Sequence, residues 1–254
     1  MRPFPDSDWG SGAWGAWTRD ADGLPAYRVA PPAEQQDTDA WHLVGNDCIN
    51  ATAHAAGHVQ LYDWRRGALL VNRWAPERHG YGGGFCYLAA HGDGTGTHAA
   101  AAAQAEQTRH FGLGYRDCTT TWEGLRCEER VSAHGDEPAL RHTVTLHNTG
   151  DAAERVQLVV VWGADLWPLR DAPIYRMGFE RLFDARRARA YRDLVCEAET
   201  LPGAALLHHR WHGGRRPPAH HRAGFDHYPR SVALQAETAE GGTPIVERAD
   251  VFFA

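Results

Sequence analysis

The feature that most constrains this fold is an alternation of apolar and polar residues, with a period of two, between positions 109 and 169. Leu125, Cys127 and Val131 alternate with charged residues, and a second alternation runs through 140–146. Successive side chains of a strand point to opposite faces, so both patterns predict strands with one buried face. The turn-forming sequence HGDEP separates them, which favours antiparallel pairing and an all-β fold.

Further strands are predicted on both sides of this pair. Five of the eight residues in the run 155–162 are β-branched or aromatic, and we expect it to be a strand buried on both faces. Apolar alternation predicts two strands within 41–74, joined around 63–67. A shorter strand is expected at 85–89, and the tail at 244–254 also favours β-structure.

Helix is expected at only one convincing place. Apolar residues recur at helical spacing over 175–195, and the alanine run at 99–106 fits at most one more helical turn. The His-rich stretch 208–230 is expected to be a loop, because it combines histidines with Gly and Pro. Without an internal repeat or a long linker, we expect one β-sandwich domain over 1–254 with an N-terminal arm at about 1–40.

The composition limits the possible partners. Hydrophobic residues make up 43% and charged residues 23% of the chain, which is ordinary for a protein with an apolar core. A formal net charge of -6 argues against nucleic acid as a partner, because such proteins need a concentrated basic surface. No stretch approaches the roughly 20 apolar residues that span a bilayer, so no membrane partner is expected.

The cysteines and histidines do not predict a cofactor or a metal. The five cysteines are far apart and lack CxxC spacing, so buried thiols in a cytoplasmic protein are the better interpretation. The clustered histidines near the C-terminus lack the defined ligand spacing of zinc sites. We therefore expect no metal and no cofactor.

Three blocks of sequence resemble a known family. They are GNDCINATAHAAGHVQLYDWRRG (45–67), HFGLGY (110–115) and VTLHNTGDAAERVQLVVVWGADLW (144–167). They are similar to the N-terminal domain of the inverting cellobiose and chitobiose phosphorylases, glycoside hydrolase family 94. The resemblance implies a galactose-mutarotase-like supersandwich, in which two large antiparallel sheets enclose the core.

The resemblance also implies what this chain cannot do alone. In that family the catalytic acid and the phosphate site lie in a helical barrel downstream of the sandwich, and this chain has no such barrel. We expect a carbohydrate-recognition or assembly module without phosphorolytic activity of its own. Two alternatives stay open: a free-standing enzyme acting on a sugar or sugar-like metabolite, and one subunit of a split phosphorylase or glycosidase with a separate helical-barrel partner. Whether the chain is an enzyme is left open.

A sugar-like small molecule is the expected ligand, and the aromatic content supplies candidates for binding it. Indole rings stack on the apolar faces of sugar rings, although most of the ten tryptophans should belong to the core. The candidate ligand-binding residues are His110, Tyr115, Trp122, Trp162 and Trp167. An unpaired strand edge near the C-terminus also favours a homodimer.

Glu129 and His142 are the tentative catalytic residues. If the strands at 125–131 and 140–146 form a hairpin in which Val131 faces Leu140, Glu129 lies directly opposite His142 on the apolar face. A carboxylate beside an imidazole can transfer protons at a sugar hydroxyl. A buried structural pair is the alternative, because polar groups on an apolar face need partners.

Overall fold

The computed structural model of the chain is all-β in its described part. It describes residues 15–29, 41–54, 57–63, 69–70, 72, 74–75, 80–81, 83–90, 96–98, 106–122, 124–153, 156–163, 167–168, 194–211, 231–239 and 244. These residues form several antiparallel sheets and contain no helix. The chain divides into two compact units, the larger made of 1–65 and 72–163 and the smaller of 66–71 and 164–254. No described helix has the length and apolar character needed to cross a membrane.

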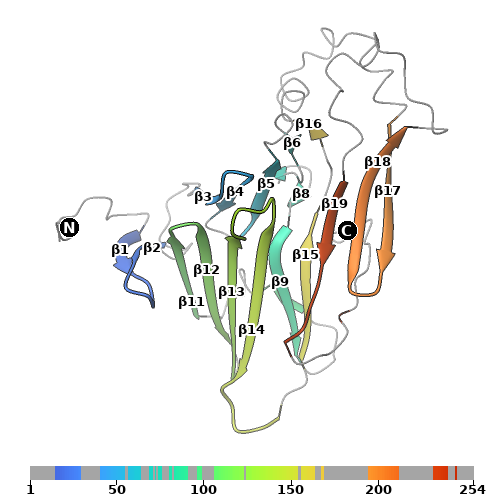
Figure 1. Ribbon diagram of the computed structural model, residues 1–254. Coiled ribbons are helices and arrows are strands. Elements are labelled where there is room, and N and C mark those ends of the chain that lie inside the picture. The colour runs from blue at the N-terminus through green and yellow to red at the C-terminus, as the bar shows by residue number, and fades with distance from the viewer. Residues whose placement is uncertain are drawn as a thin grey trace. The chain divides into compact units, whose positions relative to one another are not determined.

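A six-stranded antiparallel sheet dominates the larger unit (Figure 1). Its order is β1-β2-β11-β12-β13-β14. The strands are β1 (Gly15–Arg19), β2 (Pro25–Val29), β11 (Glu106–Gly112), β12 (Tyr115–Trp122), β13 (Leu125–Ala133) and β14 (Leu140–Asn148). Tight turns join β11 to β12 and β12 to β13, so consecutive strands are neighbours and the sheet is built largely from hairpins.

The other strands of this unit form smaller antiparallel sheets. One is β3-β4-β5, made of β3 (Trp41–Gly45), β4 (Ile49–His54) and β5 (Val59–Asp63). A second has the order β10-β9-β15 and contains β9 (Gly83–Ala90), β10 (Gly96–His98) and β15 (Val156–Trp162). The short strands β7 (Trp74–Ala75) and β8 (Gly80–Tyr81) pair with each other.

The core lies on one side of the six-stranded sheet. Cys86 and Leu88 of β9 pack against Cys127 of β13, and Val144, Leu146, Val156 and Leu158 surround them. The β3–β4 hairpin packs on the same sheet, where the His42 ring stacks on Phe111 and its Nε2 lies 2.7 Å from the carbonyl oxygen of Gly112. We call the covered side the inner face and the opposite side the outer face. The arrangement is sandwich-like.

The smaller unit is also antiparallel. The strands β17 (Leu194–Leu201), β18 (Ala204–Trp211) and β19 (Ser231–Gln235) form a three-stranded sheet in that order. Two short strands, β6 (Leu69–Leu70) and β16 (Trp167–Pro168), pair with each other. Each of the two units is thus built from sheet in its described part.

The predicted strands at 125–131, 140–146, 85–89 and 155–162 are confirmed within β13, β14, β9 and β15. One prediction about them needs correction. The third strand of the opening pattern, β15, is not buried on both faces, because Gln157 and Val160, on opposite faces, are exposed and no residue of the strand is fully buried. The block HFGLGY forms a hairpin with a two-residue turn between β11 and β12.

The described residues of the predicted helices and of the predicted loop belong to strands. Positions 175–193 and 99–105 lie outside the described residues, but Leu194 and Val195 begin β17, and Glu106 begins β11. The proposed loop at 208–230 starts inside β18, and its remaining positions lie outside the described residues. Cross-strand pairing with β17 and β19 overrides the loop-like composition of 208–211. Most of the tail at 244–254 is likewise outside the described part.

Part of the expected N-terminal arm belongs to the main sheet. The strands β1 and β2 form a hairpin, and β2 pairs with β11 from Val29 opposite Arg109 to Ala26 opposite Gly112. This hairpin therefore supplies two of the six strands of the main sheet. The expectation of a single domain over 1–254 stays a prediction.

Candidate functional site

Glu129 and His142 meet on the inner face of the six-stranded sheet, although in a different register from the predicted one. Ala133, not Val131, pairs with Leu140, so His142 lies opposite Val131 and Glu129 lies opposite Val144. The strand β13 continues two residues further toward the turn than the alternation indicated, whereas β14 begins at Leu140 as predicted. A shift of two residues leaves every side chain on its predicted face. Glu129 and His142 are diagonal neighbours, and their side chains bridge the gap with 3.3 Å between His142 Nε2 and Glu129 Oε2.

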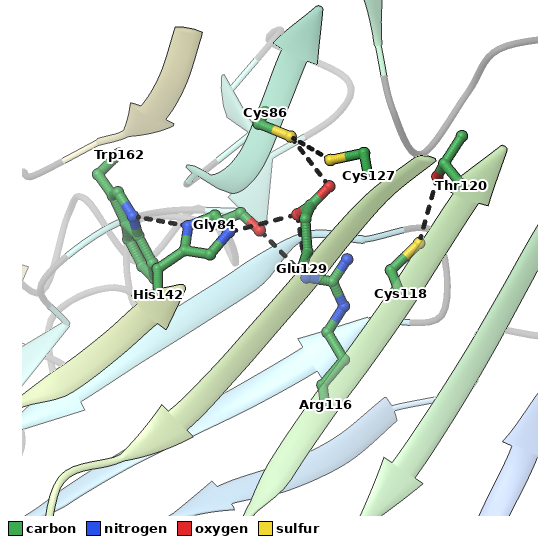
Figure 2. A network of polar contacts seen from close by, with 9 residues as sticks. All are labelled: Gly84, Cys86, Arg116, Cys118, Thr120, Cys127, Glu129, His142 and Trp162. Atoms are coloured by element: carbon green, nitrogen blue, oxygen red, sulfur yellow. Dashed lines mark hydrogen bonds and ion pairs between the residues drawn. The ribbon is translucent and has the colours of Figure 1, made fainter. Parts of the chain in front are cut away.

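The Glu129 carboxylate has partners on both oxygens (Figure 2). Its Oε1 accepts a hydrogen bond from the Cys86 thiol at 3.1 Å. On the other side, Arg116 Nη1 lies 3.7 Å from Oε2 and donates to the carbonyl oxygen of Gly84 at 3.3 Å. Gly84 has φ +79°, a conformation that glycine adopts without strain, and a Cβ there would meet Val59 at 2.6 Å. The glycine thus allows β9 to pass close to β5.

A hydrogen bond from Trp162 decides which nitrogen of His142 carries a proton. Trp162 Nε1 lies 3.2 Å from His142 Nδ1. An indole N–H only donates, so Nδ1 must be the acceptor. The proton of a neutral imidazole is then on Nε2, where it is donated to Glu129. Trp162, His142 and Glu129 therefore form a directed chain of hydrogen bonds.

Burial and charge oppose each other at this network. Burial alone would raise the pKa of Glu129, but the hydrogen bond from His142 and the positive charge of Arg116 outweigh it, and the pKa falls below its usual value. The contact with Cys127, burial and the nearby Glu129 charge all raise the pKa of the Cys86 thiol. The interior thus holds an ionised carboxylate beside a protonated thiol.

The network does not meet the condition for proton transfer to a dissolved sugar. The side chains of His142 and Glu129 are only 5% and 1% exposed, and the neighbouring strand β9 covers this face. A general acid or base must come within hydrogen-bond reach of its substrate, directly or through one water. The geometry favours a structural role for the pair, and its catalytic role stays a hypothesis.

The outer face of the same sheet carries a second set of polar groups. Cross-strand register places five side chains in one row over β2, β11, β12, β13 and β14, since each pairs directly with the next. We call this set the polar row: Arg28, His110, Asp117, Arg130 and Thr143. Arg28, Arg130 and Thr143 are exposed, and His110 and Asp117 are half-buried. No residue of the row lies on the inner face.

An arginine holds the acidic member of the polar row in place. Arg130 donates from Nε and Nη2 to the two oxygens of Asp117, at 2.7 Å each. The guanidinium also lies 4.3 Å from the centre of the Tyr115 ring, and the Tyr115 hydroxyl donates to Asp20 at 2.6 Å. Burial and the bond to Asp20 raise the pKa of Tyr115. These contacts fix the orientation of the Asp117 carboxylate.

His110 is the imidazole of the row. Partial burial lowers its pKa, and the charge of Asp117 opposes this shift only in part. Because the ordinary value is about 6.5, the imidazole is mostly uncharged at neutral pH. A neutral imidazole has one donor and one acceptor nitrogen. His110 can therefore both give and receive a hydrogen bond.

The structure separates the candidate ligand-binding residues. His110 and Tyr115 lie on the outer face, whereas Trp122, opposite Leu125, lies on the inner face. Trp162 belongs to the buried network through His142. Trp167 begins β16 in the smaller unit. Within the larger unit, the main sheet therefore separates His110 and Tyr115 from Trp122 and Trp162.

Sequence reasoning missed four residues that matter for these two sets. Arg116 and Cys86 complete the buried network, and Asp117 and Arg130 form the centre of the polar row. The alternation in RDCTTTW (116–122) could have predicted β12 and the inward direction of Arg116, because Cys118 shares its face. Cys86 comes from another sheet, and no local pattern indicates that contact.

No protein-family model and no curated protein matches this chain. The function must therefore be argued from the two faces of the main sheet.

Proposed function

We propose that this chain is a carbohydrate-recognition module and that the sugar binds on the outer face of the six-stranded sheet, over the polar row. The single observation that supports this proposal is the cross-strand row itself. It places Arg130, Asp117 and His110 next to one another on an open face.

The chemistry of the row suits sugar hydroxyls. Each hydroxyl of a sugar is both a donor and an acceptor. The Asp117 carboxylate accepts, the arginine guanidinium groups donate, and neutral His110 does both. Leu113 at the tip of the β11–β12 hairpin is 73% exposed and offers apolar contact to a ring face.

The row is also held rigid before any ligand binds. The backbone of five paired strands fixes the spacing of its members, and Arg130 donates two hydrogen bonds to Asp117. Groups that are already in place lose little conformational entropy on binding. This preorganisation favours recognition of a small, hydroxyl-rich molecule.

The wider assignment is proposed on the family resemblance. We propose that the chain has the galactose-mutarotase-like supersandwich of the phosphorylase N-terminal domains, acts in the cytoplasm and forms a homodimer. On its own it performs no phosphorolysis under this proposal. An enzymatic function based on Glu129 and His142 gains no support from their burial.

The test is a titration of the full chain, followed by NMR, with a panel of monosaccharides, disaccharides and sugar phosphates. At least one sugar should shift the resonances of the polar row. His110→Ala should weaken binding of that sugar by about tenfold, the loss expected for about 1.4 kcal/mol of hydrogen bonding.

His147→Ala is the matched control. His147 is an exposed histidine on the same outer face, opposite Arg126 and four residues along β14 from Thr143, which is about 13 Å at the rise of a strand. Its loss should leave affinity unchanged. The proposal is wrong if no sugar of the panel binds, or if His147→Ala weakens binding as much as His110→Ala.

A further inference from the structure

Two thiols and a carboxylate from different sheets meet in the core of the larger unit. Cys86 comes from β9, and Cys127 and Glu129 are two residues apart on β13. Their ligand atoms all lie within 4.8 Å of one another, and all three residues are buried. We propose that these residues bind a divalent, borderline-soft metal ion such as Zn²⁺, which joins β9 to β13.

The spacing of the donors fits a tetrahedral metal. The two sulfurs are 3.9 Å apart, and a tetrahedral ion with metal–sulfur bonds of about 2.3 Å would hold them about 3.8 Å apart. Cys86 Sγ is 3.1 Å from Glu129 Oε1, against about 3.5 Å expected for a sulfur and an oxygen on the same ion. A disulfide would instead need the sulfurs about 2.05 Å apart. These two distances are thus close to those around a tetrahedral ion, and the two cysteines are free thiols in this structure.

The surrounding hydrogen bonds orient the carboxylate for this role. Oε2 of Glu129 is the oxygen that faces His142, which leaves Oε1 toward the sulfurs. Because Trp162 donates to Nδ1 of His142, the proton stays on Nε2 and that nitrogen cannot be a ligand. His142 therefore positions the Glu129 ligand, as outer partners of metal-bound carboxylates commonly do.

The charges of the site balance when the ion is bound. A divalent ion replaces the protons of the two thiols and releases them to solvent, so the ion and two thiolates together are neutral. Glu129 and Arg116 then cancel each other. Nη2 of Arg116 is buried and has no hydrogen-bond acceptor among the described residues. A water molecule as the fourth ligand would place an oxygen acceptor in this region.

Sequence spacing could not indicate the site, because the two cysteines are 41 residues apart and belong to different sheets. The site is independent of the polar row, which lies on the opposite face of β13. Failure of the metal proposal would therefore leave the sugar proposal standing, and the reverse also holds.

The experiment loads the reduced full chain with Zn²⁺, removes unbound ion, and measures bound zinc by mass spectrometry. Co²⁺ replaces Zn²⁺ in parallel, because thiolate ligands give Co²⁺ a charge-transfer absorption that imidazole ligands do not. We expect one tightly held ion per chain, the thiolate absorption, and a higher melting temperature with the ion. X-ray absorption at the zinc edge should show two sulfurs at about 2.3 Å and lighter ligands at about 2.0 Å.

Cys127→Ser should abolish the thiolate absorption, whereas Cys118→Ser should keep it. Cys118 is the matched control, since it is equally buried on the neighbouring strand, directly opposite Glu129, but its sulfur contacts Thr120 and is not one of the three ligand atoms. X-ray absorption of the unmodified chain decides the question even if Cys127→Ser fails to fold. The proposal is overturned if only nitrogen and oxygen ligands are seen, if no ion is retained, if Cys118→Ser loses the absorption too, or if Cys86 and Cys127 form a disulfide.

Discussion

Two of the carboxylate–arginine pairs in the main sheet face opposite sides. On the outer face, Asp117 and Arg130 are directly opposite each other and form two hydrogen bonds of 2.7 Å. On the inner face, Arg116 and Glu129 are diagonal neighbours, and their closest atoms are 3.7 Å apart. The pair with the better geometry is the one in contact with water. The looser pair is almost completely buried, with both side chains 1% exposed.

Geometry alone therefore does not determine how much an ion pair contributes to the stability of the fold. In water, an ion pair with good geometry contributes about 0–1 kcal/mol, because solvent screens both charges. In the core, each charge depends on the other, since neither has solvent as an alternative partner. Glu129 also accepts hydrogen bonds from His142 and Cys86. We expect mutations on the inner face to affect folding and those on the outer face to affect binding.

The largest effect is expected for Glu129→Gln. The amide keeps the shape of the side chain but leaves the buried Arg116 without a counter-charge. Losing one partner of a buried pair typically costs about 3–5 kcal/mol. Urea denaturation should show this fall in the free energy of unfolding, while sugar affinity of the folded fraction stays unchanged.

Glu128→Gln is the control for that experiment, because Glu128 is the next residue on β13 and faces outward, close to Arg126. It should lower the free energy of unfolding by about 1 kcal/mol or less. If Glu129→Gln instead folds normally and loses sugar binding or turnover, the inner face is the functional one and the comparison is reversed.

An intermediate effect is expected for Gly112→Ala, which disturbs the outer face through packing. Tyr115 lies over Gly112, and a Cβ there would be 2.0 Å from Cζ of the Tyr115 ring. The ring must move, and its hydrogen bond to Asp20 and its contact with Arg130 are lost. Overpacking of this kind costs about 1–3 kcal/mol, measurable by thermal unfolding.

A double-mutant cycle tests the cause of that effect. In a Tyr115→Ala background the ring is absent, so Gly112→Ala should lose most of its cost. An equal cost in both backgrounds would place the strain in the β11 backbone and not in the ring, and Tyr115 would then have no part in ordering the outer face.

For the inner face, the sequence predicted which side chains point inward, but not the register of the strands or the contact with Cys86. Alternation along β13 and β14 correctly placed Glu129 and His142 on one apolar face, because the period of a strand is two. The register was wrong by two residues, since it depends on where the turn at 134–139 closes, with His134 donating to the carbonyl of Ala139. The contact of Cys86 with Glu129 could not be predicted, because contacts between sheets leave no local sequence pattern.

The outer face escaped prediction for a different reason. Polar residues at alternate positions of β11, β12 and β13 look like an ordinary solvent-exposed face. Only the pairing of β2, β11, β12 and β13 shows that Arg28, His110, Asp117 and Arg130 form one line. The strands β11 and β12 were themselves missed, because Arg109 and Arg116 occupy inward positions where apolar residues are expected.

The smallest effect on stability is expected for Asp117→Asn, and it completes the comparison. Asparagine keeps one acceptor oxygen for Arg130 but removes the charge, so the free energy of unfolding should fall by about 1 kcal/mol or less. At about 1 M salt the Debye length is about 3 Å, and this small difference should shrink further. The cost of Glu129→Gln should persist at high salt, because buried pairs are screened much less. Urea denaturation of both variants at low and high salt measures these changes in the free energy of unfolding.

An Asp117→Asn cost of several kcal/mol that is insensitive to salt would mean that the outer face is covered in solution. The polar row could not then be an open sugar site.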